Sequence, residues 1–113
     1  MKVDRERMAE AAVAASELLK SLGNPHRLMI LCQLIEGERP VGELAASIGV
    51  RDSTVSQHLA LLRKDGLVQA RREAQTIRYS IASPAALQMM QTLYSIYCAP
   101  EPFCAPARTA SQG

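Results

Sequence analysis

The clearest pattern in this sequence is an alternation of apolar and polar positions between residues 52 and 65. Val55, Leu59 and Leu62 recur at spacings of four and three residues, which places them on one side of an α-helix. The other side of that helix carries small or polar residues, namely Ser53, Ser56, Gln57, Ala60 and Lys64. The segment therefore predicts an amphipathic helix whose outer face presents hydroxyl groups, one amide and a basic end.

Similar periodicity predicts helices on both sides of this segment. An Ala-rich helix is expected over residues 4–22, with an apolar seam formed by Met8, Ala12, Ala15, Leu19 and Leu22. Asn24 and Pro25 have the chemistry of an N-cap and a first-turn proline, and Asp52 and Ser83 are expected to cap later helices. The further helices are expected over residues 25–35, 41–48, 52–65 and 83–98.

The order of elements predicts a winged helix-turn-helix. Two short helices meet at a tight turn at Gly49, and residues 67–71 and 76–81 have the composition of two strands around residues 72–75. The expected fold class is mainly α with a small β-hairpin, in the order α-α-α-α-β-β-α. Residues 1–98 form the expected domain, and residues 99–113, with three prolines, are expected to be a mobile tail.

The first and last helices carry more apolar surface than one small domain can cover. A symmetric homodimer through these terminal helices is the simplest arrangement that buries it. Such a dimer would present two recognition helices about one DNA turn apart, and hence bind two-fold symmetric operator DNA. The alternative, in which both helices wrap around their own subunit, stays open at this stage.

Positive charge is concentrated beside the polar helix. The chain carries a net charge of +2, yet residues 51–78 alone hold six basic against three acidic side chains, a local charge of +3. This concentration favours a polyanionic partner and insertion of the helix into a DNA major groove. For the helix taken alone, an ordinary solvated surface is the alternative interpretation.

Composition and cysteine number limit the remaining function classes. No signal peptide or membrane span is recognisable, and three cysteines, an odd number, favour reduced thiols in the cytoplasm. An enzyme is disfavoured because the sequence has neither a Gly-rich phosphate loop nor a carboxylate cluster.

Four runs of sequence resemble the ArsR/SmtB family of bacterial winged-helix repressors. They are Leu22-Gly-Asn-Pro-His-Arg-Leu-Met-Ile-Leu31, Val41-Gly-Glu-Leu44, Ser53-Thr-Val-Ser-Gln-His-Leu59 and Leu62-Arg-Lys-Asp-Gly-Leu-Val68. The resemblance covers about residues 15–98. It implies a homodimer that binds operator DNA and releases it when an inducer binds or modifies the protein.

The resemblance also implies which residues contact DNA. Ser53, Ser56 and Gln57 would contact bases, with Arg51, Asp52 and Lys64 beside them on the same helix. The wing would reach phosphates through Arg71, Arg72 and Arg78. Asp52 departs from the Gln or Ser more usual there. A carboxylate at this position would repel phosphate or accept a hydrogen bond from a cytosine amine. His58 lies beside the inward face, and we interpret it as a packed structural histidine rather than a base reader.

Metal sensing, common in that family, does not fit this sequence. The family's Cys-x-Cys box would fall in Val41-Gly-Glu-Leu-Ala-Ala, which has no cysteine. The last helix has no Asp, Glu or His ligands, and His26 and His58 are the chain's two histidines. No metal and no cofactor is therefore expected.

The cysteines instead resemble those of the persulfide-sensing BigR/SqrR branch of the family. Cys32 and Cys98 stand in the two helices where that branch carries its sensing cysteines, so the resemblance implies that reactive sulfur links them and lowers DNA affinity. Each cysteine taken singly is equally compatible with a small core residue. Cys104 could be a competitor, an auxiliary thiol or a bystander.

Two alternatives stay open. The same scaffold could respond to peroxide, to disulfide stress, or to a thiophilic ion such as arsenite held by Cys32, Cys98 and Cys104. It could also be a constitutive DNA-binding protein with inert thiols.

Overall fold

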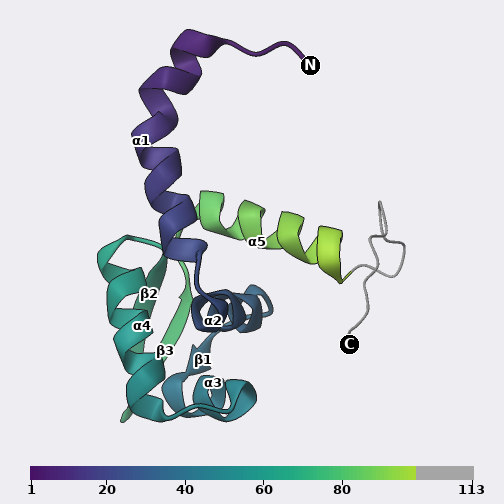
Figure 1. Ribbon diagram of the computed structural model, residues 1–113. Helices are drawn as coiled ribbons and strands as arrows, with labels where there is room; N and C mark the ends of the chain where they lie inside the picture. Colours follow the sequence, from purple (N-terminus) through teal and green to yellow (C-terminus); the bar gives the residue numbers. More distant parts are fainter. Residues whose placement is uncertain (99–113) are drawn as a thin grey trace.

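The computed structural model describes residues 1–98 and confirms the winged helix-turn-helix fold (Figure 1). Helices α2, α3 and α4 and a small sheet form the body, and α1 and α5 project from it. The elements are α1 (Arg5–Leu22), α2 (Pro25–Ile35), β1 (Arg39–Pro40), α3 (Val41–Ile48), α4 (Asp52–Lys64), β2 (Val68–Glu73), β3 (Thr76–Ile81) and α5 (Pro84–Tyr97). The predicted tail, residues 99–113, lies outside the described residues.

Local capping explains where most of these helices begin. The Asn24 side chain accepts hydrogen bonds from the backbone N–H groups of His26 and Arg27, and Pro25 follows at the first helical position. The Ser83 hydroxyl accepts from the N–H of Ala86, and Pro84 follows in the same way. Both caps agree with the sequence prediction.

The predicted cap of α4 at Asp52 was wrong. Arg51 is the N-cap, because its carbonyl accepts the first two hydrogen bonds of the helix, from Thr54 and Val55. Asp52 is the first helical residue, and its side chain makes no capping hydrogen bond. Its carboxylate still lies in the first turn, where a negative charge interacts favourably with the helix dipole.

The sheet contains one strand that the sequence did not predict. Two residues, Arg39 and Pro40, pair antiparallel with Tyr79 and Arg78, so the strand order is β1-β3-β2. The β2–β3 hairpin is longer than predicted, because pairing runs from Val68 opposite Ile81 to Glu73 opposite Thr76. Ala74 closes this hairpin at φ 56°, in the left-handed region that costs a residue with a Cβ about 1 kcal/mol.

The core lies between α4 and the elements packed around it. Its largest fully buried side chains are Ile30, Leu31, Leu44, Val55, Leu59 and Leu62. Helix α1 adds Ser21 and Leu22 at its last turn, while Met8, Val13 and Leu19 remain more than half exposed. Most of the predicted apolar seam of α1 is therefore uncovered in a single chain. None of the helices described here is both long and apolar enough to cross a membrane.

Candidate functional site

Helix α4 presents the polar face that the sequence predicted. Ser53, Ser56, Gln57, Ala60 and Lys64 are all exposed. On the opposite side, Val55, Leu59 and Leu62 have no exposed area and pack into the core. Arg51 and Asp52 are exposed at the start of the same helix. These six polar and charged side chains are therefore free to contact a partner along one edge of the body.

Two of the three wing arginines already have acidic partners. The Arg71 guanidinium holds both carboxylate oxygens of Glu38, with Nη2 2.6 Å from Oε1 and Nε 2.9 Å from Oε2. Arg78 Nε donates to Glu73 Oε1 at 2.8 Å. Arg72 instead donates to the carbonyl of Ala74 within the hairpin, and forms no ion pair within residues 1–98. A polyanion would therefore have to displace a carboxylate from Arg71 and Arg78.

Glu38 was not identified from the sequence. It lies before β1, 33 residues from Arg71, and no local pattern links the two. The hydrogen bonds from Arg71 lower the pKa of Glu38, and the charges of Arg71 and Arg78 lower it further. The same pair raises the pKa of Arg71. Glu38 therefore stays ionised and neutralises part of the wing's positive charge at neutral pH.

His58 packs against α2 rather than pointing away from the body. Its ring meets that of His26 edge to face, with ring centroids 5.7 Å apart, and its Nδ1 lies 3.5 Å from Arg27 Nη1. Desolvation lowers the pKa of His58, and the positive charge of Arg27 and then that of His26 lower it further. These contacts agree with the interpretation of His58 as a packed structural residue.

Cys32 and Cys98 come from α2 and the end of α5, two helices that pack together. Cys32 is half-buried, whereas Cys98 is exposed and its backbone N–H donates to Tyr94 at 2.8 Å. Burial raises the pKa of the Cys32 thiol, and the negative charges of Cys98 and Glu36 raise it further. Both cysteines are free thiols in this structure. Cys104 lies outside the described residues.

Metal-ligating side chains do not gather anywhere in the described part of the chain. Over residues 1–98, no group of three or more His, Cys, Asp and Glu side chains is arranged to hold a metal ion. The chemistry available there is that of a thiol pair and of an exposed polar helix beside a basic hairpin.

Comparisons with known proteins agree with this geometry. Residues 24–70 match a family described as bacterial regulatory protein, arsR family. The biofilm growth-associated repressor of Agrobacterium fabrum is 46% identical over 94 residues, which cover 83% of this chain and 80% of that protein. The crystal structure of the transcriptional repressor BigR from Xylella fastidiosa superposes with a TM-score of 0.80 at 43% identity, covering 86% of this chain and 99% of that one.

A second solved structure bears on assembly. The homodimeric winged helix-turn-helix DNA-binding domain of Mb0332 from Mycobacterium bovis superposes with a TM-score of 0.67 at 33% identity. The alignment covers 82% of this chain and 86% of that one.

The environment of His58 predicts a pH dependence of folding stability. Its folded pKa lies below the ordinary value of 6.5, so the unfolded chain binds the proton more tightly. The free energy of unfolding should therefore fall as pH drops below about 6.5 toward the folded pKa. We expect His58→Gln to flatten this fall, measured by urea denaturation between pH 7.5 and 5.5.

Glu38→Gln is the matched control, because the pKa of Glu38 lies below 4.5 and its titration falls outside this range. If the free energy of unfolding of His58→Gln fell with pH as steeply as that of the parent, His58 would not be the cause of the pH dependence.

Proposed function

Because this chain belongs to the arsR family of bacterial regulatory proteins, we propose that it is a DNA-binding transcriptional repressor controlled by two of its thiols. The observation that carries the proposal is α4, whose buried apolar side fixes an exposed face of hydroxyl and amide groups within the matched region. Residues 1–98 act as the functional domain. The protein works in the cytoplasm, where its operator and its reduced thiols are found.

The outer face of α4 reads the operator. Ser53, Ser56 and Gln57 contact base edges in the major groove, because their short donors and acceptors match groups displayed there. Arg51 and Lys64 contact the backbone at the two ends of the helix, and Asp52 lies at the groove edge. A carboxylate at Asp52 disfavours phosphate and suits a cytosine amine, which gives this position a role in selecting sequence.

The wing contributes phosphate contacts of unequal strength. Arg72 needs no exchange of ion-pair partner, whereas Arg71 and Arg78 exchange Glu38 and Glu73 for phosphate oxygens. Exposed ion pairs contribute only about 0–1 kcal/mol each, so the exchange is energetically accessible. Glu38 then moderates how strongly the wing is attracted to any DNA.

A homodimer through α1 and α5 places two such faces on one operator. Met8, Val13 and Leu19 on α1, and Tyr94 and Tyr97 on α5, are more than half exposed in the single chain. Burying side chains of this kind contributes about 25 cal/mol per Å² of apolar surface. The homodimeric state of the Mycobacterium bovis domain supports a homodimer here.

The inducer is a low-molecular-weight persulfide that acts first on Cys98. Exposure gives Cys98 access to the reagent, and the raised pKa of Cys32 keeps the second thiol protonated. The Cys98 thiolate attacks the terminal sulfur of RS–SH, RS⁻ leaves, and Cys98 becomes a persulfide. The Cys32 thiol then loses its proton to solvent and attacks the sulfur bonded to the Cys98 Cβ, and HS⁻ leaves as the disulfide forms. The sulfane sulfur is the oxidant, because it is reduced to sulfide.

A second persulfide can lengthen the bridge. It first converts Cys32 to its own persulfide. The Cys98 persulfide anion then displaces HS⁻ from the Cys32 sulfur and leaves a trisulfide. A direct disulfide needs Cα atoms within about 7 Å, and an inserted sulfur relaxes that limit. Either bridge ties the end of α5 to α2, which packs against α4, so the dimer element and the reading element are constrained together.

Base reading by α4 predicts that Gln57→Ala weakens discrimination between operator and random DNA by roughly 1–3 kcal/mol, the effect of losing one bidentate base contact. Competition binding against mutated operators measures this loss. Gln88→Ala, the same change on the exposed side of α5, is the control and should leave discrimination intact.

Glu38→Gln should act differently, because it releases Arg71 from its partner. It should tighten binding to all DNA and steepen the dependence of that binding on salt concentration.

Unchanged sequence preference in Gln57→Ala would place the reading face elsewhere.

The dimer proposal predicts that Leu19→Glu yields a monomer. Leu19 is 57% exposed in the single chain, so the charge is tolerated there, but it would be buried without a partner in the dimer. Sedimentation equilibrium gives the mass directly. Leu61→Glu, the same substitution at a 51% exposed position on α4, should remain dimeric. A dimeric Leu19→Glu variant would exclude this interface.

The thiol mechanism predicts that Cys32→Ser and Cys98→Ser bind the operator like the parent when reduced, yet fail to release it on persulfide treatment. Cys104→Ser should keep the response, because the proposed bridge uses only the other two thiols. Intact mass and operator binding are measured on the same samples after persulfide, peroxide or arsenite treatment.

Three results would overturn this mechanism. Persulfide-driven release in the Cys32→Ser, Cys98→Ser double variant would remove the thiol pair from it. Release by peroxide or arsenite alone would identify a different inducer. DNA affinity that is independent of thiol state would identify a constitutive DNA-binding protein.

A further inference from the structure

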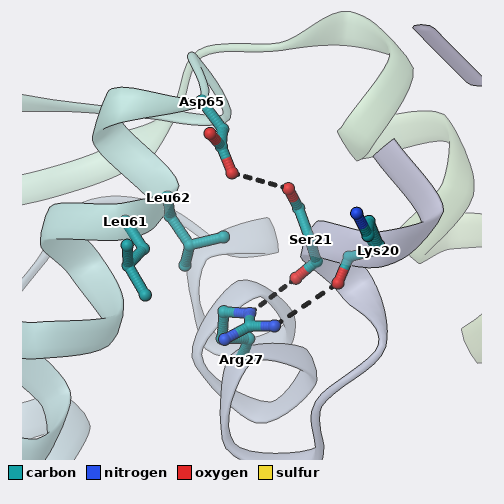
Figure 2. Close-up of a pocket in the computed structure, with 6 residues that line it drawn as sticks. All are labelled: Lys20, Ser21, Arg27, Leu61, Leu62 and Asp65. Atoms are coloured by element: carbon teal, nitrogen blue, oxygen red, sulfur yellow. Dashed lines mark hydrogen bonds between the residues drawn. The ribbon is translucent and has the colours of Figure 1, made fainter. Parts of the chain in front are cut away.

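A partly buried hydrogen bond joins the last turn of α1 to the end of α4. Ser21, 9% exposed, is the one buried polar side chain in the described chain, and its hydroxyl donates to Asp65 Oδ2 at 2.7 Å (Figure 2). Asp65 is the residue that ends α4. The two residues are 44 positions apart, so this bond joins distant segments of the chain.

Arg27 makes a second connection at the same place. From the first turn of α2, its Nε donates to the carbonyl of Ser21 at 2.7 Å and its Nη2 to the carbonyl of Lys20 at 3.3 Å (Figure 2). Its third nitrogen, Nη1, faces His58 of α4. The guanidinium thus donates hydrogen bonds to carbonyls at the C-terminus of α1. Its positive charge also interacts favourably with the helix dipole there. We call this set of three residues, Ser21, Arg27 and Asp65, the α1 joint.

Little else holds α1 in its direction. Residues 5–17 are exposed along their whole length, and Leu18 and Leu22 supply the apolar contacts at the end of the helix. An open pocket of about 270 Å³ lies beside the joint, lined by Lys20, Ser21, Arg27, Leu61, Leu62 and Asp65. Because this space is not filled by side chains, the polar contacts of the joint oppose tilting of α1.

We propose that the α1 joint sets the angle between the dimerisation helix and the recognition helix, and thereby the half-site spacing that the repressor accepts. This inference rests on the proposed dimer through α1. An 18-residue helix is about 27 Å long at 1.5 Å per residue, so a tilt of about 10° moves one end by about 5 Å relative to the other. That displacement exceeds the roughly 3.4 Å rise of one base pair. Ser21, Arg27 and Asp65 are therefore positioning residues for operator recognition.

The test measures spacing selectivity. Half-sites are first selected by the parent protein from random DNA, and duplexes are then made with two half-sites separated by the selected spacing or by one or two base pairs more or less. The parent should prefer one spacing by about tenfold or more, the effect of one mismatched position. In Ser21→Ala and Arg27→Lys this preference should fall below threefold, while affinity for a duplex with a single half-site stays unchanged. Lys keeps the charge at Arg27 but lacks the planar fork that reaches both carbonyls.

Conservative variants separate positioning from folding. Ser21→Thr keeps a hydroxyl donor and Asp65→Asn keeps an acceptor oxygen, so both should retain the parent's spacing preference. Ser16→Ala, the same change at an exposed position of α1, is the control. Thermal unfolding and sedimentation of every variant report stability and dimer mass. If Ser21→Ala does not fold, the spacing preference of Arg27→Lys decides whether the α1 joint sets the spacing.

Two failures are distinguishable. If the parent selects no half-site or does not bind as a dimer, the proposed function is wrong. If the parent binds one spacing and a folded, dimeric Ser21→Ala or Arg27→Lys variant keeps the same preference, the α1 joint does not set spacing and the inference is overturned.

Discussion

The orientation of α4 depends on the burial of one side of that helix. Val55, Leu59 and Leu62 are fully buried, and each contributes roughly 1.5–3 kcal/mol when taken out of water. Rolling the helix by one residue would expose much of this surface, a cost comparable with the whole stability of roughly 5–15 kcal/mol of a small domain. The hydroxyl and amide groups on the other side are therefore held toward the solvent by the core. Rigid support of this kind suits the base-reading role proposed for this surface.

Packing fixes the position of the polar helix face, whereas ion pairs adjust the charge of the wing beside it. The wing carries its arginines on a twisted hairpin, where Arg71 and Arg78 lie directly opposite each other. Like charges in such a pair repel, and Glu38 and Glu73 offset that repulsion. The carboxylate fork also holds the Arg71 guanidinium in one orientation. The same acidic residues that stabilise the hairpin thus limit its attraction for polyanions in general.

Sequence reasoning succeeded where the physical cause is local. The caps at Asn24 and Ser83 act on groups two or three residues away, and the two faces of α4 follow from helical periodicity, so all are visible in the sequence. The strand β1 depends on pairing with β3, about 40 residues later, and two residues carry no periodicity. The contacts of Glu38 with Arg71 and of Ser21 with Asp65 likewise join distant segments. For the site, the exposed face was predicted, whereas the partners that adjust it were not.

Because most of α1 is exposed in the single chain, the order of this helix should depend on protein concentration. The exposed part of α1, residues 5–17, is of a length at which an isolated helix is only marginally stable in water, and three large apolar side chains of α1 face solvent in the single chain. In the proposed dimer, association would order and cover it, so the fraction of ordered α1 would rise with protein concentration by mass action. A cell with few copies would then hold chains whose α1 is frayed, and repression would begin only above a threshold of synthesis.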